Sequence, residues 1–305
     1  MCDIMCSGDV AANRAADGTI PDRCEIIIPS YNRPQRLYET VRAVRHIYPD
    51  MPLCLAVQGE AAHDDLAALV ARDGRIRLDH HREPGVVSAL NTSITSSTAD
   101  VVLLLDDDAV PCVGWLEAHL AALNSDSRIA YTSGREVNVT QSRSAISEVL
   151  RIGAEKLLGF LVPVECRVNG RIIGWTTRFG LIFTNFCHPG RARINAPMEG
   201  NFATRTADFR AVGGFDPRFI GNAWGYGAEL GQRFERQGRT GAYVGDAIIL
   251  HYPHPSGGSR ARKGNTWYFD FLRNNAILIE SIGAFGWAGA APRLIKRYVQ
   301  NLRLT

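Results

Sequence analysis

The sequence predicts an α/β fold in which a mostly parallel, Rossmann-like sheet is flanked by helices. Two observations lead to this prediction. Short apolar runs alternate with amphipathic segments of helical length through the first half of the chain, and the most apolar run, Val101–Leu105, leads directly into three aspartates. Alternation at this spacing is typical of βαβ crossovers, which build parallel sheets.

The composition is that of an ordinary globular protein with one large or two small domains. Of its 305 residues, 46% are hydrophobic and 21% are charged, and the net charge of +3 gives no reason to expect a nucleic-acid partner. The seven cysteines show no CxxC spacing, which is typical of reduced thiols in a cytoplasmic protein. Residues 1–22 lack the pattern of a signal peptide and are expected to form a flexible tail.

In the first half, each apolar run is followed by a segment with helical periodicity. We expect strands over residues 24–29, 53–58, 75–80 and 101–105, the third of them a weak edge strand. Between them, helices are expected around residues 37–48, 66–70 and 87–94.

The second half has a less regular pattern and continues the same mixed α/β domain. We expect a helix over 144–160, hairpin-like segments at 171–175 and 180–183, a strand over 200–205, a glycine-rich turn at 211–216, a helix over 229–237 and a strand over 245–252. Residues 266–305 are expected to form a C-terminal helical extension.

The three aspartates after the central strand are the strongest candidate site. If extended geometry continues past Leu105, Asp106 and Asp108 point one way and Asp107 the other, because strand side chains alternate. Two carboxylates at the carboxyl end of a central strand repel each other unless a cation lies between them, and oxygen ligands suit Mg²⁺ or Mn²⁺. The alternative is a solvated acidic turn that caps the next helix.

Four motifs together resemble those of a known family. In their order and spacing over roughly residues 24–275, they resemble the inverting GT-A fold glycosyltransferases of family 2: Ile28-Pro29-Ser30-Tyr31-Asn32-Arg33, Asp106-Asp107-Asp108, Val212-Gly213-Gly214-Phe215-Asp216 and Leu230-Gly231-Gln232-Arg233. The resemblance implies a GT-A nucleotide-diphospho-sugar transferase fold and a hexosyltransferase-like enzyme. It also implies Mn²⁺ or Mg²⁺ as cofactor, and a catalytic domain over 23–265 with a nucleotide-binding half, 23–134, and an acceptor half, 135–265.

The resemblance also implies roles for individual residues around the metal. Asp108 would ligate the ion and His251 would complete the metal site, although a lone histidine is more often structural. Asp106 would contact the ribose or the donor sugar, and Asp107 would lie among the donor-binding residues.

Further donor contacts are implied by the turn after the first strand and by two loops. Pro29, Ser30, Tyr31 and Arg33 would enclose the nucleotide, or else they only form a turn. Glu60 stands near the place where the family often has an acid that binds the base. The basic, glycine-rich segment 257–264 contains Arg260, which would close over the diphosphate; a solvated basic loop is the alternative.

The general base is the residue that the resemblance assigns least clearly. The family usually has an acidic pair shortly before the Leu-x-x-Arg segment, and here that pair falls on Tyr226 and Gly227. If the loop is two residues shorter, Glu229 is the catalytic base; otherwise it is an acid favoured at a helix N-terminus by the helix dipole. Glu199 and Asp216 are the remaining candidates.

The implied partners are a nucleotide-sugar donor and a glycan, lipid-linked or small-molecule acceptor. The end of the chain, 293–303, is basic and amphipathic, which is compatible with peripheral contact at the inner face of a membrane, with packing on the domain, or with a homodimer. Two other functions remain open: a degenerate domain that binds sugar nucleotides or glycans without turnover, and a nucleotidyltransferase. The latter usually has a glycine-rich phosphate loop after its first strand, which is absent here.

Overall fold

The computed structural model describes residues 23–59, 64–139, 152–153, 155–157, 159–253 and 264–283. Four predictions therefore lie outside the described residues, in whole or in large part: the tail over 1–22, the helix over 144–160, the basic loop at 257–264 and the helix near the end of the chain.

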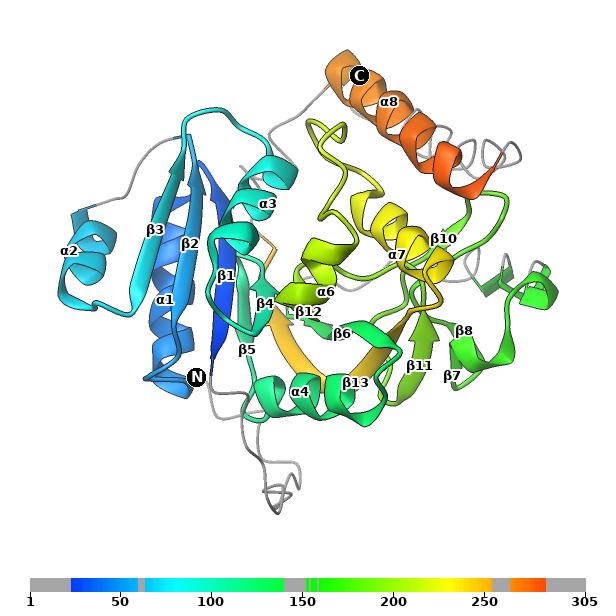
Figure 1. The fold of residues 1–305 in the computed structure, drawn as a ribbon, viewed down its shortest axis with the longest axis horizontal. Coiled ribbons are helices and arrows are strands. Elements are labelled where there is room, and N and C mark those ends of the chain that lie inside the picture. The colour runs from blue at the N-terminus through cyan, green and yellow to red at the C-terminus, as the bar shows by residue number, and fades with distance from the viewer. Residues whose placement is uncertain are drawn as a thin grey trace.

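The first half forms the parallel part of the sheet, as predicted (Figure 1). Its strands are β1 (Cys24–Tyr31), β2 (Leu53–Gln58), β3 (Ile76–His81) and β4 (Val101–Leu105), joined by helices α1 (Pro34–Ile47), α2 (Asp64–Arg72) and α3 (Val86–Ser96). β3 lies at the edge of the sheet, as its weak pattern predicts, and its side chains alternate between more and less buried. All five residues of β4 are buried, which fits a central position.

The second half extends the same sheet in mixed orientation. Its elements are β5 (Ala109–Pro111), α4 (Trp115–Ser125), β6 (Ile129–Asn138), β11 (Arg191–Ile194), β12 (Asn201–Arg205), α6 (Thr206–Ala211), α7 (Tyr226–Arg236) and β13 (Thr240–His251). The strand order is β11-β13-β6-β12-β4-β1-β2-β3, and β12 runs antiparallel to both of its neighbours, β4 and β6. The fold is thus α/β with a mixed central sheet flanked by helices.

The segment between β6 and β11 consists of short pieces. It contains 3-10 helices at Gly159–Leu161 and Val164–Cys166, the pair β7 (Arg167–Val168) and β8 (Arg171–Ile172), and the pair β9 (Trp175–Thr176) and β10 (Ile182–Phe183). The predicted hairpin material is present, but residues 171–172 and 175–176 belong to two different pairs.

The sheet separates two hydrophobic cores, and the alternation along each strand decides which residue enters which core. Ile27 and Leu104 face the core covered by α3, α6 and α7. Ile26 and Leu103 face the core covered by α1, α2 and α4. A strand that is buried on both faces reads as a continuous apolar run, which is the pattern observed in β1 and β4.

A buried polar network joins β12 to α4. Trp115 Nε1 donates a hydrogen bond to Asn201 Oδ1 at 2.7 Å, and His119 Nε2 lies 2.9 Å from the same oxygen. The amide of Asn201 donates to the Ala247 carbonyl oxygen at 3.1 Å. Burial lowers the pKa of His119 to about 4, so its imidazole is neutral. The network therefore fixes β12 to β13 and α4 at the first residue of the strand.

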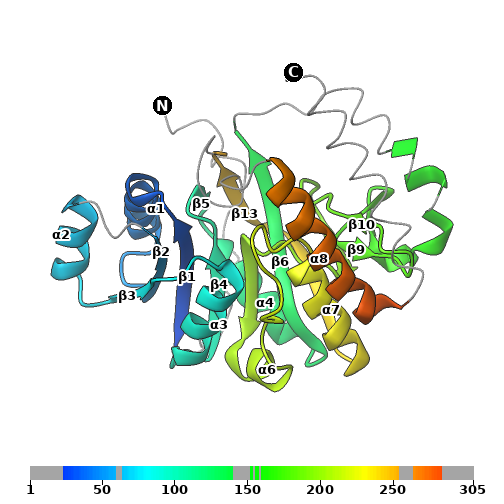
Figure 2. The ribbon, with the colours of Figure 1, turned by 90° about the horizontal axis from the view of Figure 1, so that it is seen from above.

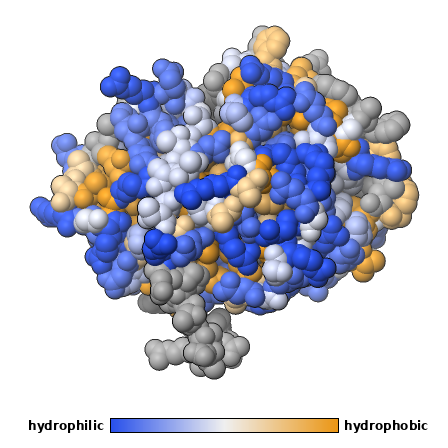
Figure 3. Space-filling view, in the orientation of Figure 1, coloured by the Kyte–Doolittle hydropathy of each residue, from blue (hydrophilic) through white to orange (hydrophobic). Residues whose placement is uncertain are grey.

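The described part of the C-terminal extension is one helix, α8 (Gly264–Ile282), which lies beside α7 (Figure 2). Among the described residues, no helix is long and apolar enough to cross a membrane. On the face seen in Figure 3, hydrophilic residues predominate and the hydrophobic ones form small, separate groups.

We expect Asn201→Ala to destabilise the protein by about 3 kcal/mol, because it leaves the buried Trp115 and His119 N–H groups without an acceptor. The measurement is the free energy of unfolding in urea. Asn124→Ala, at an exposed position of α4, is the matched control and should change the value by less than about 0.5 kcal/mol. Equal stability of the two variants would contradict the structural role of Asn201.

Candidate functional site

A polar pocket with a volume of about 400 Å³ opens where β1, β2 and β4 end. Segments from both halves of the chain line it: Pro29, Ser30, Tyr31, Arg33, Gln58, Pro84, Gly85, Val86, Asp106, Asp107, Asp108, Glu199, Gly200, Gly221, Asn222, Tyr226 and His251. The carboxyl edge of a parallel sheet is where open α/β folds bind ligands. The pocket therefore brings together most of the residues singled out from the sequence.

The turn after β1 is bonded to the middle aspartate. Ser30 Oγ donates to Asp107 Oδ2 at 2.6 Å, and Arg33 donates to Asp107 Oδ1 at 2.9 Å. Thr40 of α1 donates to the backbone carbonyl of Asp107 at 2.7 Å. Burial raises the pKa of Asp107, and the charge of Arg33 and the bond from Ser30 oppose that rise. Asp107 thus holds the turn in place, and its carboxylate is directed toward the turn.

Asp106 and Asp108 face a different direction from Asp107, although Asp107 and Asp108 form a turn and do not continue the extended strand that the prediction assumed. Together with His251 they each offer one ligand atom, and these atoms lie within 4.8 Å of one another. His251 arrives at this point because the last residue of β13 pairs with Ala109 of β5, directly after the triplet. The backbone N–H of Tyr252 donates to the Asp108 carbonyl oxygen at 2.8 Å, which fixes the two segments together.

The donor set of this cluster fits a divalent ion. Two carboxylates and an imidazole suit Mn²⁺, and carboxylates alone also suit Mg²⁺. His251 Nε2 lies 3.1 Å from Asp108 Oδ1, and its Nδ1 lies 2.5 Å from Glu136 Oε1. A carboxylate on the far nitrogen is the usual way to orient a ligating histidine. Among the described residues, Asp106, Asp108 and His251 form the group of acids and histidines whose ligand atoms lie close enough together to hold a metal ion.

The electrostatics of the cluster indicate a need for positive charge. Burial raises the pKa of Asp106 to about 7, and the neighbouring charge of Asp108 adds to this rise. Burial lowers the pKa of His251, but the hydrogen bonds and charges of Asp108 and Glu136 outweigh it and raise the value to about 10. A proton on His251 supplies one positive charge, and a metal ion at the same place would have to displace it.

Glu199 is a further acid in the pocket, between the cluster and helix α7. It is half-buried, and its Oε1 accepts a hydrogen bond from the backbone N–H of Gly227 at 2.9 Å. Burial raises the pKa of Glu199 to about 7, and the bond from Gly227 partly offsets that rise. Tyr226 lines the pocket beside it, and burial raises the pKa of this phenol well above 10, so that it stays protonated.

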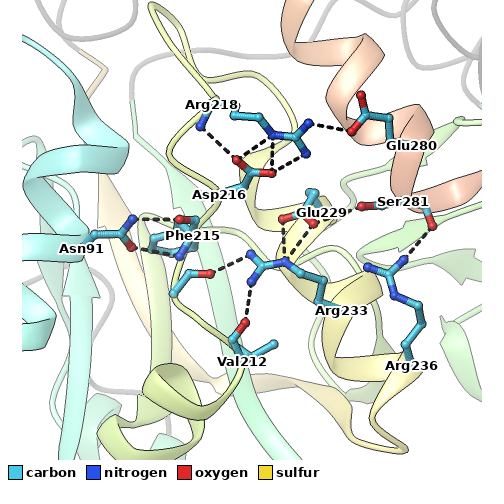
Figure 4. A network of polar contacts seen from close by, with 11 residues as sticks. Asn91, Val212, Phe215, Asp216, Arg218, Glu229, Arg233, Arg236, Glu280 and Ser281 are labelled. Carbon is cyan, nitrogen blue, oxygen red and sulfur yellow. Dashed lines mark hydrogen bonds and ion pairs between the residues drawn. The ribbon is translucent and has the colours of Figure 1, made fainter.

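Glu229 is not placed to act as a base toward this pocket. Its side chain is 3% exposed, and both carboxylate oxygens accept hydrogen bonds from Arg233 Nε, at 2.8 and 2.9 Å (Figure 4). Ser281 of α8 donates to the same carboxylate at 3.0 Å. Arg233 in turn donates to the carbonyl oxygens of Val212 and Gly214. These contacts link α7 to α8 and to the glycine-rich turn, and the catalytic role of Glu229 stays a prediction.

The remaining predicted residues divide into two groups. Glu60 and Arg260 lie outside the described residues. Asp216 pairs with Arg218 (Figure 4). This pairing lowers the pKa of Asp216 despite the opposing effect of burial, so Asp216 stays ionised and bound to Arg218.

Sequence reasoning missed Gln58 and Glu136. Gln58 lines the pocket at the end of β2, and its Oε1 accepts a bond from the Gly85 N–H at 2.8 Å. Glu136 lies in the exposed half of β6, and only the pairing of β6 with β13 brings it to His251. The position of Gln58 at the end of a predicted strand could have indicated that it lines the site, whereas no feature of the sequence near Glu136 indicates its contact with His251.

Residues 25–166 match the family model described as glycosyl transferase family 2. This segment belongs to that family. It includes the turn after β1 and the three aspartates, so two of the four motifs lie within the matched segment, and the other two lie beyond it.

The chain is also similar in sequence to two relatives. The chain is 27% identical over 150 residues to the pre-mycofactocin glycosyltransferase of two Mycobacterium tuberculosis strains; the match covers 47% of this chain and 30% of each relative. The chain thus matches less than a third of the length of these relatives.

Two solved structures share the fold over most of the chain. GalNAc-T7 with UDP, GalNAc and Mn²⁺ has a TM-score of 0.60 at 15% identity, covering 85% of this chain and 47% of that one. Glucosyl-3-phosphoglycerate synthase from Mycobacterium tuberculosis, in complex with Mn²⁺, UDP and phosphoglyceric acid, has a TM-score of 0.51 at 16% identity, covering 86% of this chain and 78% of that one. At these identities the likeness establishes the GT-A fold.

We expect the cluster of Asp106, Asp108 and His251 to bind Mn²⁺. The affinity should depend on these ligands and on Glu136, which orients the imidazole of His251. Glu136→Gln, which removes only the group that orients the imidazole, should weaken binding by about 10- to 100-fold. Asp108→Ala should weaken it further. Mn²⁺ titration followed by electron paramagnetic resonance measures both effects, with the exposed Asp64→Ala of α2 as control. Unchanged binding by Asp108→Ala would rule out this cluster as the metal site.

We expect Glu229→Ala to lower the free energy of unfolding by about 3 kcal/mol, because it leaves the largely buried Arg233 without its carboxylate. Urea unfolding measures the change. The exposed Glu280→Ala, which removes only a surface pair with Arg218, is the control and should cost less than about 1 kcal/mol. A small effect at Glu229 would show that the link between α7 and α8 contributes little.

Proposed function

We propose that this protein is a metal-dependent, inverting glycosyltransferase that moves a sugar from a nucleotide diphosphate donor to a hydroxyl or amine acceptor. The observation that carries the proposal is the cluster of Asp106, Asp108 and His251 in the same pocket as the turn after β1. This combination gives a divalent ion and a nucleotide adjacent places at the carboxyl edge of the sheet.

The chemistry of the pocket residues supports this reaction. Departure of a nucleoside diphosphate places negative charge on its phosphate oxygens, and a metal ion held by Asp106, Asp108 and His251 would stabilise that charge electrostatically. The turn 29–33 and Gln58 line the part of the pocket at the ends of β1 and β2, where a base and ribose would lie. Asp107 keeps this turn in position through Ser30 and Arg33.

We propose that one half of the chain binds the nucleotide and the other half binds the acceptor. Residues 23–134 supply the turn and the aspartates, and thus the nucleotide side. Residues 135–265 supply Glu199, Gly221, Asn222 and Tyr226, and thus the acceptor side. Contact of the C-terminal helices with a membrane and formation of a homodimer remain predictions.

The named ligands of the similar structures favour a uridine diphosphate donor and Mn²⁺. Both are bound in the GalNAc-T7 and glucosyl-3-phosphoglycerate synthase structures, the second of which also contains phosphoglyceric acid. The acceptor of the present protein is proposed only by class, as a glycan, a lipid-linked sugar or a small hydroxylated molecule.

One observation favours a second candidate, a domain that binds sugar nucleotides without turnover. The family usually has an acidic pair at the positions of Tyr226 and Gly227, and neither residue here can accept a proton at neutral pH. A nucleotidyltransferase is not favoured, because the turn after β1 is not a glycine-rich phosphate loop.

The test is release of nucleoside diphosphate from UDP-glucose, UDP-galactose, UDP-N-acetylglucosamine and GDP-mannose. Each donor is incubated with Mn²⁺, Mg²⁺ or EDTA, with and without simple sugar and phosphoglycerate acceptors. We expect release that requires the metal and is lost in Asp108→Ala but retained in Asp64→Ala, with an inverted anomeric centre in the product by NMR. Nucleotide binding without release from any donor would favour the binding domain, and release that persists in EDTA would contradict metal dependence.

A further inference from the structure

The absence of an acid at position 227 is matched by a carboxylate that reaches the same space from another strand. Gly227 lies in the first turn of α7, and its N–H donates to Glu199 Oε1 at 2.9 Å. A Cβ atom built on Gly227 would be 2.1 Å from Glu199 Oε1, much closer than two atoms can approach. The Glu199 carboxylate therefore fills the volume in which a side chain at position 227 would begin.

We propose that Glu199 is the general base of the transfer and that it replaces the carboxylate which the family usually carries on helix α7. This inference rests on the proposed glycosyl transfer and names the residue that activates the acceptor. A side chain at position 227 would then have to displace the carboxylate of the base.

Glu199 lies on the correct side of the pocket for this role. It lines the pocket, and the next residue, Gly200, touches the metal-binding group: a Cβ on Gly200 would be 2.1 Å from Asp106 Oδ2. The backbone N–H of Asp106 donates to the Gly200 carbonyl oxygen at 3.2 Å. Glu199 is thus fixed beside the cluster that would hold the leaving group, on the segment just before β12.

The partners of Glu199 also suit a group that accepts a proton. Within the described part of the chain, no lysine or arginine pairs with Glu199, and its carboxylate accepts hydrogen bonds from backbone N–H groups. Its raised pKa, about 7, makes it a stronger base than an ordinary glutamate and still leaves it ionised in a useful fraction of molecules at neutral pH.

The competing acids lack this freedom. Glu229 binds Arg233 through both oxygens, and Asp216 binds Arg218 through both oxygens. Asp106 belongs to the cluster that would hold the ion. Asp108 belongs to the same cluster and Asp107 is bonded to Ser30 and Arg33, so Glu199 is the acid lining the pocket that is left for proton transfer.

In the proposed step, one proton moves to Glu199 and one sugar moves to the acceptor. The acceptor hydroxyl gives its proton to a carboxylate oxygen of Glu199 while its own oxygen forms a bond to the anomeric carbon of the donor. The bond between that carbon and the diphosphate oxygen breaks, and its electron pair leaves with the nucleoside diphosphate. Glu199 ends protonated and returns the proton to solvent after the products leave.

The experiment compares Glu199→Gln with the wild type, using the donor and metal that give the fastest release in the panel described above. We expect kcat to fall by roughly 100-fold or more, the usual contribution of a general base. Binding of UDP with Mn²⁺, measured by calorimetry, should be unchanged. Glu117→Gln, at an exposed position of α4, is the matched control and should retain full activity.

A pair of variants distinguishes a base from a merely structural residue. Glu199→Ala should be as inactive as Glu199→Gln, and adding Gly227→Asp to Glu199→Ala should restore part of kcat, because it returns a carboxylate to the same volume at a helix N-terminus. Gly227→Asp alone should lower activity, since it collides with Glu199. Recovery in the double variant is not expected if Glu199 only supports the fold.

The outcomes separate this inference from the proposed function. If the wild type releases no nucleoside diphosphate from any donor, the proposed transfer itself fails. If the wild type is active and Glu199→Gln retains its kcat, the transfer stands and Glu199 is not the base. If Glu199→Gln loses activity together with UDP binding, Glu199 acts in donor binding and the proposal is likewise overturned.

Discussion

The turn that follows β4 is the constraint on which the site depends. β4 ends at Leu105, Asp107 and Asp108 form a turn, and the backbone N–H of Ala109 donates to the Asp106 carbonyl oxygen at 3.2 Å. Asp107 faces Ser30 and Arg33, while Asp106 and Asp108 lie with His251; Arg33 also reaches Asp108, at 3.4 Å. One turn thus produces both a structural acid, which holds the turn after β1, and a pair of acids suited to a cation.

The antiparallel insertion of β12 brings the second half of the chain to that same edge. Because β12 runs against β4, Asn201 pairs with Leu105, and the segment just before β12 emerges beside the aspartates. Glu199 and Gly200 reach the pocket in this way. β13 delivers His251 by its pairing with β5, and the buried bonds of Asn201 to α4 and β13 fix both strands in register.

The close packing of the Glu199 carboxylate against Gly227 offers a simple account of why position 227 has no acidic side chain. An acid on α7 and an acid before β12 would compete for the same volume, so a chain can carry only one of them without rearrangement. The present sequence carries the acid before β12, Glu199. Glu229 stabilises the fold instead, because its pair with Arg233 joins α7, α8 and the glycine-rich turn.

The sequence by itself determined the local features of this protein. Its apolar periodicity predicted the parallel strands and the edge position of β3, and its motifs predicted the family. It also predicted that Asp107 faces away from Asp106 and Asp108, although the segment is a turn and not the extended strand that the prediction assumed. These features follow from neighbouring residues in the chain. Only the tertiary structure decided the rest: Glu136 and His251 meet, and Glu199 occupies the space left by Gly227, because strands distant in sequence pair side by side. The contact of Glu229 with Arg233 belongs to the tertiary structure as well, since spacing along a helix does not reveal which other groups will surround a carboxylate.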